Sequence, residues 1–531
     1  MKIRHLTPRA RISATVGVIA IGALALSGCA SGGSSANYVE DGTFVYALGT
    51  DIGSLDPALG VTSAALAVGQ YAYDPLVHLD EDGKIVAGLA KDWKVDGTTV
   101  TFTLRDDVTC ADGAKFTATT AKKNLDFIGD PENASPLLGA FVPVGATTDA
   151  DDASGTLTLE LAAPSPFVIE ALSNVVMVCD NGLEDRTSIV TATDGTGPFV
   201  LDEAVANDHY TYSVREGYTW GPDGATTAEK GTPAKVEFRV IPNETTAANL
   251  LVSGDINAAQ IVGPDAARLA DLQATSSQLV LGEGWFNQAP DRVTADLAVR
   301  TALVQALDLD ALANVASSGT GKRATQLAVV DPAPCQGGDF TAAFPDAGVE
   351  NAASTLEEAG WAKGSDGIYA KDGKPLTIAF IHDTALGAGG DAAAELAVTA
   401  WQALGVTVNA SGQPTDQLAG IMFGGGDWDL VWEPLNVSTP DQLVGYLSGP
   451  TLADGGTNFA SIDNADYTAA TTEAMGMVGT DGCSTWFEAE TALVQNVDVL
   501  AFANSVLYTY AKNAEFSGAT SPDPTSIRLT K

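Results

Sequence analysis

The sequence is short of basic residues and of histidine. Its 531 residues include 27 Lys and Arg against 67 Asp and Glu, which gives a formal net charge of −40. So acidic a surface repels phosphate backbones and anionic lipid headgroups, which excludes nucleic acid as a partner. No C-x-x-C is present and the histidines are scattered, so we expect no metal site. The four histidines are His5, His78, His209 and His382.

The motifs of the common hydrolases are also missing. The chain has no G-x-S-x-G, no Ser followed three residues later by Lys, and no H-E-x-x-H. The chain therefore has few residues that could serve in histidine-based catalysis. A pair of catalytic carboxylates, as in a glycosidase, stays open because the chain holds many acids. We expect a protein that is not an enzyme and has no cofactor.

No segment contains eighteen consecutive uncharged apolar residues, but the N-terminus holds a shorter apolar run. Residues 2–11 are basic, residues 12–26 are apolar, and Leu26-Ser27-Gly28-Cys29 follows. About fifteen residues are too few for a membrane span and are typical of an export signal. The last four resemble the bacterial lipobox, which implies a signal peptide over 1–28 and a lipid on Cys29. Residues 29–39 would form a flexible tether.

Apart from Cys29, the chain has only four cysteines. An even number in an exported protein predicts two disulfides, and four cysteines allow three pairings. With 45% hydrophobic residues over this length, the chain has enough apolar side chains for several domains. The four cysteines are Cys110, Cys179, Cys335 and Cys483.

Strand and helix patterns alternate along the chain. Residues 44–48 and 100–105 are typical of strands, and Asp-Gly at 82–83, 96–97 and 372–373 predicts hairpins. The best helical pattern runs from Leu297 to Val315, and a second runs over 352–359. This interleaving predicts an α/β fold.

Six motifs in order resemble family 5 of the extracellular solute-binding proteins, which bind peptides or nickel and serve ABC importers. The resemblance covers about residues 44–512, and the ordered set is more specific than any single motif. The motifs are Ser54-Leu55-Asp56-Pro57; Leu89-Ala90-Lys91-Asp92-Trp93; Phe102-Thr103-Leu104-Arg105 with Asp112-Gly113; Gly195-Thr196-Gly197-Pro198-Phe199; Val299-Arg300-Thr301-Ala302-Leu303; and Ala359-Gly360-Trp361 with Asp372-Gly373.

The resemblance implies two lobes joined by two crossovers. Lobe one would comprise residues 40–285 and 500–531, with an extra subdomain over about 80–194, and lobe two would comprise 286–499. The crossovers would lie near residues 285–287 and 506–508. On this map the pairings Cys110–Cys179 and Cys335–Cys483 each stay within one lobe, so we favour them.

The ligand would lie between the lobes. The resemblance puts Trp432 where family members have a cleft tryptophan, and in peptide binders an Asp three residues later binds the α-amine. Here that position is Leu435, so either Glu433 or Asp441 binds the ammonium or the solute is not a standard peptide. The other expected contacts are Ser54, Leu55, Asp56, Trp285 and Asn287. Core packing for the tryptophans and a structural role for Glu433 stay open.

The expected function is capture of a solute, most of all a peptide, and its delivery to an ABC permease. The protein would be a monomer, anchored by its lipid on the outer face of the cytoplasmic membrane. An oligosaccharide or another non-peptide solute is the first alternative, and an anchored carboxylate hydrolase is the second.

Overall fold

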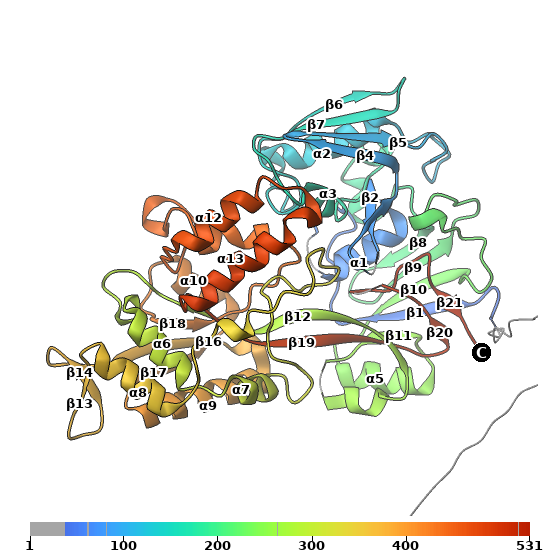
Figure 1. Ribbon diagram of the computed structural model, residues 1–531. Coiled ribbons are helices and arrows are strands. Elements are labelled where there is room, and N and C mark those ends of the chain that lie inside the picture. Colours follow the sequence, from blue (N-terminus) through green and yellow to red (C-terminus); the bar gives the residue numbers. More distant parts are fainter. Residues whose placement is uncertain (1–37, 61–62, 81, 263, 519) are drawn as a thin grey trace, which may run out of the picture. The chain divides into compact units, whose positions relative to one another are not determined.

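The computed structural model describes residues 38–531 except 61, 62, 81, 263 and 519 (Figure 1). The predicted signal peptide, the lipidation site Cys29 and all but the last two residues of the tether lie outside the described residues. Within the described part of the chain, no helix has the length and apolar character needed to cross a membrane.

One mixed sheet of ten strands runs through the described chain. β16 is parallel to both its neighbours, β1 is also parallel to both of its own, and the other pairs are antiparallel. The strand order is β17 (Thr407–Gln413), β16 (Thr377–Asp383), β18 (Leu430–Trp432), β12 (Gln273–Phe286), β19 (Val499–Ala511), β11 (Ala258–Gln260), β1 (Thr43–Leu48), β10 (Lys235–Val240), β9 (His209–Val214) and β8 (Phe199–Val205). Alternating strands and helices confirm the predicted α/β class.

Two long antiparallel strands, β12 and β19, connect the two halves of this sheet. They pair from Gln273 opposite Ala511 to Trp285 opposite Val499. At one end β19 also pairs with β11, and at the other end β12 also pairs with β18. The register shifts around Gly282, where a Cβ would lie 2.4 Å from the Phe502 ring. We call β11, β1, β10, β9 and β8 the first half of the sheet, and β17, β16 and β18 the second half.

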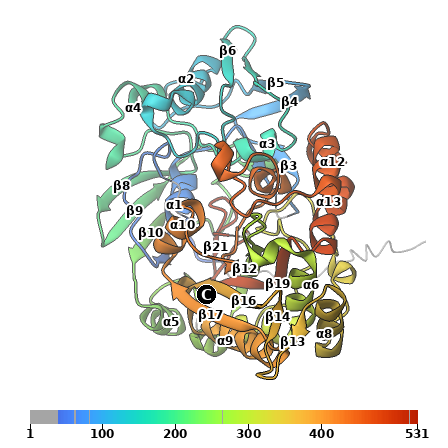
Figure 2. The ribbon, with the colours of Figure 1, turned by 90° about the vertical axis from the view of Figure 1, so that its left-hand side faces the viewer.

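A separate four-stranded antiparallel sheet lies between β1 and β8 in the sequence. Figures 1 and 2 both show its strands grouped with α2 (Ala118–Gly129). Phe102, Leu125 and Leu157 belong to their shared core. We call this unit the four-stranded subdomain. Its strands are β4 (Ala90–Asp96), β5 (Thr99–Leu104), β7 (Thr156–Glu160) and β6 (Thr147–Asp151).

Helices cover both halves of the large sheet. Those around the first half and the subdomain are α1 (Ser63–Ala72), α3 (Val168–Leu172), α4 (Asp180–Glu184) and α5 (Glu244–Ser253). Those around the second half are α6 (Leu297–Gln305), α7 (Leu309–Ala316), α8 (Val349–Glu358), α9 (Gly387–Leu404), α10 (Thr415–Phe423), α11 (Val444–Leu447), α12 (Ala465–Ala474) and α13 (Cys483–Gln495). The short strands are β2 (Val77–Leu79), β3 (Ile85–Ala87), β13 (Ala362–Lys363), β14 (Tyr369–Lys371), β15 (Lys374–Pro375), β20 (Ala514–Glu515) and β21 (Arg528–Leu529).

Local turn signals were accurate, while one helix was predicted too long. Each predicted Asp-Gly hairpin joins two adjacent strands: β2 to β3, β4 to β5, and β14 to β15. The helix expected from Leu297 to Val315 is instead two helices, α6 and α7. The chain breaks at Asp308, whose carboxylate accepts a hydrogen bond from the Ala311 N–H and caps α7. Apolar spacing continues across such a break, which is why periodicity alone missed it.

The structure contains the two favoured disulfides, Cys110–Cys179 and Cys335–Cys483. Cys110–Cys179 lies in the core that the strands of the four-stranded subdomain share with α2. Cys335–Cys483 joins the loop before α8 to the start of α13. Their Cα–Cα distances are 6.2 and 5.2 Å, within the ordinary range.

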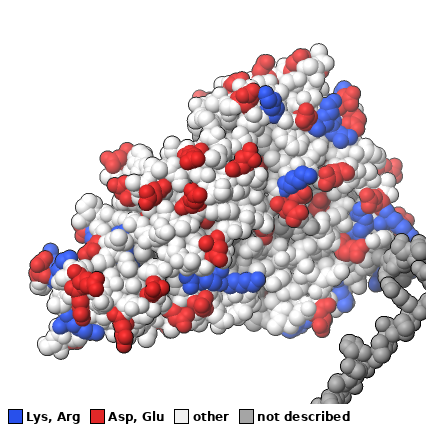
Figure 3. All heavy atoms as spheres, in the orientation of Figure 1, with Lys and Arg blue, Asp and Glu red and all other residues white. Residues whose placement is uncertain are grey.

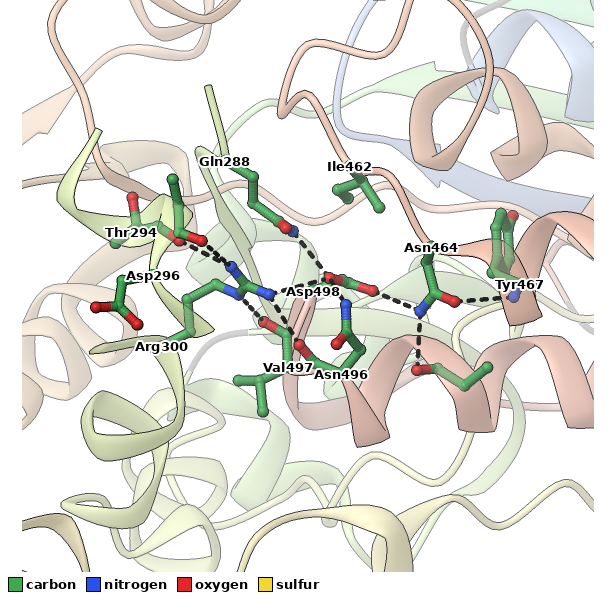
Figure 4. A network of polar contacts seen from close by, with 12 residues as sticks. Gln288, Thr294, Asp296, Arg300, Ile462, Asn464, Tyr467, Asn496, Val497 and Asp498 are labelled. Carbon is green, nitrogen blue, oxygen red and sulfur yellow. Dashed lines mark hydrogen bonds and ion pairs between the residues drawn. The ribbon is translucent and has the colours of Figure 1, made fainter. Parts of the chain in front are cut away.

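A buried polar network ties α6 to the start of β19 (Figure 4). The Arg300 guanidinium lies 3.5 Å from the Asp498 carboxylate, and both side chains are at most 3% exposed. Arg300 also donates to the backbone carbonyls of Val497 and Asn496. Asp498 accepts further hydrogen bonds from the side chains of Gln288, Asn464 and Asn496. The buried charge is therefore both paired and solvated by protein groups.

Candidate functional site

A pocket opens beside the first half of the sheet, at the predicted opening loop. The loop after β1, helix α1 and the segment that follows α3 form its walls. Predicted ligand residues Ser54, Leu55 and Asp56 all line it. Its other walls include Ile52, Leu66, Gln70, Tyr73, Asn174 and Thr193.

Asp56 holds this loop in place. Its side chain is 1% exposed and forms an ion pair with Arg186, whose Nε donates to it over 3.0 Å. The same carboxylate accepts from the Ala58 N–H, while Ser54 Oγ accepts from the Asp56 N–H. The guanidinium of Arg186 also stacks 3.8 Å above the Phe127 ring of α2. Asp56 thus fixes the pocket wall to the subdomain through a paired charge.

Trp285 and Asn287 lie at the end of β12 and just beyond it, and both are buried. The indole of Trp285 is 0% exposed, packs edge-on to Phe459, and donates from Nε1 to the Glu433 carbonyl. Asn287 donates from Nδ2 to the Trp428 carbonyl. In this structure both side chains position the β12–β18 junction, and their contact with ligand stays a prediction.

Trp432 packs into the core on the face of the sheet that is opposite to Trp285. Its ring is 1% exposed and lies 4.6 Å from Phe502 and 5.0 Å from Phe380, measured between ring centroids. The ring contributes to packing in this structure, which is the alternative that the sequence left open. A role at the ligand stays a prediction for this residue as well.

Three carboxylates lie side by side on the opposite face of the sheet, where β16, β18 and β12 meet. In the parallel pair of β16 and β18, His382 is opposite Trp432. In the antiparallel pair of β12 and β18, Gly284 is opposite Trp432. One residue further, Asp383 and Glu283 therefore flank Glu433. The Glu433 N–H donates to the Glu283 carbonyl over 3.2 Å, in agreement with that register. Directly opposite side chains share a face at about 5 Å spacing. We call Asp383, Glu433 and Glu283 the carboxylate row.

In the row, Asp383 and Glu283 are buried and Glu433 is half-buried, and two of the three have an oxygen without a hydrogen-bond partner among the described residues. Glu283 is 1% exposed, and its Oε2 accepts from the Leu435 N–H while its Oε1 has no hydrogen-bond partner among the described residues. Oε2 of Glu433 is likewise buried without a partner in the described chain. Asp383 accepts from the Ala385 N–H and from the Thr415 hydroxyl. A site with unused acceptors, and with no cation paired to it among the described residues, differs from an ordinary structural ion pair.

Burial and mutual repulsion raise the pKa values of the row. Burial raises the pKa of Glu283 to about 8, and the charges of Glu490 and Glu433 act in the same direction. Burial and, after it, the neighbouring Asp383 raise the pKa of Glu433 to about 8. The raised pKa values favour the protonated form of both glutamates. A cation placed beside them would compensate for the loss of those protons.

Asp441 lies apart from the row, in the short helix η8 (Pro440–Leu443). Its Oδ1 is buried and has no partner among the residues that the structure describes. Burial raises its pKa. The charge of Asp441 contributes to the raised pKa of Glu170 in α3. Asp441 and Glu433 are therefore in two different environments.

The predicted residues fall into three groups rather than one. Ser54, Leu55 and Asp56 line the pocket beside the first half, whereas Trp285, Asn287 and Trp432 are packed inside the second half. Glu433 and Asp441 are the predicted residues with unused acceptor atoms.

Four charged residues described above were not predicted from the sequence: Arg186, Asp383, Glu283 and Glu170. A signal was available for one of them, because Glu283 shares a strand face with Trp285 two residues later. The other three are isolated charges whose partners become neighbours only through folding.

The surface also carries many carboxylates. Figure 3 shows Asp and Glu side chains spread over the visible face, with Lys and Arg in smaller groups between them. Such a field attracts cationic solutes over anionic ones.

Comparison with known proteins gives a family match over most of the chain. The model of the bacterial extracellular solute-binding proteins, family 5 (middle), matches residues 84–451. That stretch includes the four-stranded subdomain, the carboxylate row and Asp441. It also includes Cys110 and Cys335, the first cysteine of each disulfide.

Several curated proteins match in sequence, and two of them are described below. The nickel-binding periplasmic protein of Escherichia coli (strain K12) is 30% identical over 370 residues, which cover 63% of this chain and 65% of that protein. The glutathione-binding protein GsiB of Salmonella typhi is 29% identical over 290 residues, covering 53% of this chain and 55% of that protein. The alignments thus span between about half and two thirds of these relatives, and both are named as binding proteins.

A solved structure matches over nearly the whole length. The ABC transporter substrate-binding protein CtaP of Listeria monocytogenes superposes with a TM-score of 0.76 at 18% identity, covering 93% of this chain and 100% of that one. At this identity the likeness concerns the fold, which is the predicted two-lobed, binding-protein-like α/β fold.

Proposed function

Because the chain belongs to the bacterial extracellular solute-binding proteins, family 5, we propose that it captures a small solute and delivers it to an ABC importer. The match over residues 84–451 is the observation that carries this proposal. The strands β12 and β19 support it, since two continuous connections between halves of a sheet suit a hinge. No bond is broken in such a cycle: the protein closes on the solute, carries it and releases it.

The proposed lobes follow the two halves of the sheet. Lobe one comprises residues 40–285 and 500–531 with the extra subdomain at about 80–194, and lobe two comprises 286–499. The solute would lie between the Ser54–Asp56 loop of lobe one and the second-half residues Glu433 and Asp441. Trp285, Asn287 and Trp432 would shape the wall behind them.

A peptide is the proposed solute, and its α-ammonium group would bind at Glu433 or Asp441. Both side chains have a buried carboxylate oxygen without a partner among the described residues. An ammonium donates three hydrogen bonds and carries the positive charge that the carboxylate row lacks. The acidic surface would favour the approach of such a solute.

The proposed location is the outer face of the cytoplasmic membrane, where a lipid on Cys29 would anchor a monomer. The support for the anchor is the order of basic head, apolar run and Leu26-Ser27-Gly28-Cys29. A lipid would hold the protein at a membrane whose anionic headgroups repel its surface. The partners would then be the solute and the ABC permease in the periplasmic or extracytoplasmic space.

Native mass spectrometry of the purified protein, followed by denaturation and identification of what is released, tests the proposal. We expect short peptides with a free amino terminus. We expect Glu433→Gln to lower the bound fraction at least tenfold, because the neutral amide removes the charge that holds the ammonium. Glu473→Gln, an exposed acid on α12, is the matched control and should leave occupancy unchanged. Release of sugars would overturn the peptide proposal, and equal occupancy in both variants would overturn the role of Glu433.

A further inference from the structure

The segment around α3 contributes side chains to two different apolar cores. Three residues of α3 belong to the core of the four-stranded subdomain: Val168, Ile169 and Leu172. Phe167, the residue just before α3, belongs instead to a small separate apolar cluster. The other buried members of that cluster all come from proposed lobe two: Cys335, Ala474 and Trp486. Phe167 therefore joins the subdomain of proposed lobe one to proposed lobe two.

The Phe167 ring is fully enclosed where it meets lobe two. It is 1% exposed, and its centroid lies 6.3 Å from that of Trp486 of α13, which is also 1% exposed. One residue earlier, the Pro166 carbonyl accepts a hydrogen bond from the Gly479 N–H over 2.8 Å. An aromatic pair and a backbone hydrogen bond thus meet at one place. We call Pro166, Phe167, Gly479 and Trp486 the α3 contact.

The backbone at Gly479 is suited to this close approach. Its φ angle is +54°, in the left-handed region that favours glycine. A Cβ at this position would lie 3.2 Å from Oε1 of Glu170 on the facing helix α3. Glu170 is itself 5% exposed and has little room to move aside. A larger side chain at position 479 would therefore press against α3.

The α3 contact favours the closed arrangement of the lobes by itself. Separation at this place would expose the rings of Phe167 and Trp486 to water, at a cost that grows with the apolar area exposed. The hydrogen bond between Gly479 and Pro166 would be exchanged for bonds to water. None of the four residues belongs to the proposed solute site. The stabilisation therefore does not require a bound solute.

We propose that the α3 contact is a latch, anchored by Phe167, which holds the two lobes closed whether or not a solute is bound. Solute then adds to the stability of a closed form that already exists. The latch also lowers the population of the open form, so it slows both uptake and release of the solute. The proposal rests on the proposed division into lobes and on no property of the solute.

Hydrogen exchange at the Gly479 amide reports the latch directly, because this N–H donates across it. The full-length protein is freed of retained solute by unfolding in urea and refolding with its disulfides intact, and native mass spectrometry verifies that no solute is left. We expect the Gly479 amide to be protected in this solute-free protein. Phe167→Ala should lower that protection by at least about tenfold, because the missing ring leaves a cavity in the contact.

A second amide and a second substitution separate opening of the latch from general destabilisation. The Leu104 N–H, which donates to the Gly155 carbonyl within the subdomain, should keep its protection in Phe167→Ala. Phe141→Ala is the matched control, since Phe141 is a half-buried ring that packs on the subdomain core. This control should leave protection at Gly479 unchanged. Phe167→Leu should give a smaller loss at Gly479, and it serves if Phe167→Ala does not fold.

Two results would overturn the latch. One is rapid exchange at Gly479 in the unmodified, solute-free protein, since the lobes would then part without solute. The other is equal protection at Gly479 in the unmodified protein and in Phe167→Ala. Neither result bears on the solute, which is identified in the protein before refolding, so the proposed function stands or falls separately.

Discussion

Two groups of buried polar residues near the second half of the sheet contain carboxylates, and they are built in opposite ways. Around Asp498, one guanidinium and three side-chain amides surround a single carboxylate (Figure 4). In the carboxylate row of Asp383, Glu433 and Glu283, the acids have one another as charged neighbours and leave acceptor atoms unused.

This difference separates a structural charge from a candidate binding group. A saturated ion pair stabilises one geometry and has nothing left to offer a ligand. Unpaired acids in a buried place are costly, and perturbed titrating groups of this kind gather at functional sites. Substitutions in each of the two groups test that distinction.

Removing the cation of the saturated network should have the largest effect on stability. Arg300→Met leaves Asp498 buried without its charge partner, which costs about 3–5 kcal/mol in the free energy of unfolding. Urea denaturation followed by circular dichroism measures this. Arg268→Met, at an exposed ion pair of the first half, is the control and should change stability by less than about 1 kcal/mol. Similar losses in both variants would contradict the structural role assigned to Arg300.

A smaller loss should follow from removing one amide of the same network. Asn464 donates 2.7 Å to Asp498, and its side-chain oxygen caps α12 by accepting from the Tyr467 N–H. Asn464→Ala removes a hydrogen bond to a charged group and a helix cap, at a cost of about 2 kcal/mol. The same urea titration tests it, and a cost near that of Arg300→Met would mean that the amide, rather than the guanidinium, carries the network.

The row should show its difference as a dependence of stability on pH, with a smaller change per pH unit than the losses above. Glu283 keeps its proton in the folded protein up to a pKa of about 8, while in the unfolded chain it loses the proton near its ordinary value of 4.5. Its contribution to stability is therefore fully present below about pH 4.5 and is lost as the pH rises to about 8. Over that window one proton changes the unfolding free energy by about 1.4 kcal/mol per pH unit.

Glu283→Gln should remove that slope, because the amide does not titrate. Urea midpoints measured at pH 5, 6, 7 and 8 should fall less steeply in the variant than in the unmodified protein. Glu473→Gln should keep the full slope. An unchanged slope in Glu283→Gln would mean that Glu283 is ionised in the folded state, and the row would then need a cation within the protein.

Local features of the fold were predictable from the sequence, because neighbouring residues determine them. Asp372-Gly373 forms its hairpin through two successive positive φ angles, which these two residue types tolerate. The disulfide pairing followed from the family resemblance, which assigned each cysteine to a lobe. The helical break at Asp308 was missed, since apolar periodicity carries no information about a side chain that caps a new helix.

The site was predictable only in part, because its residues meet through long-range strand pairing. Glu433 was singled out beside Trp432, but Asp383 and Glu283 become its neighbours only when β16 and β12 pair with β18. The burial of these side chains could not be predicted either. The sequence leaves open whether Trp285 and Trp432 face solvent, and both are packed in this structure. Charges such as Glu170 and Arg186 gain significance only from contacts with residues far away in the chain.

A crystal structure of the protein with the solute it retains on purification tests whether Glu433 or Asp441, rather than the saturated network at Asp498, binds the solute. We expect a cationic nitrogen of the solute within about 3 Å of a carboxylate oxygen of Glu433 or Asp441. A bound solute whose cationic group lies elsewhere, with both carboxylates contacted only by water or protein, would contradict it.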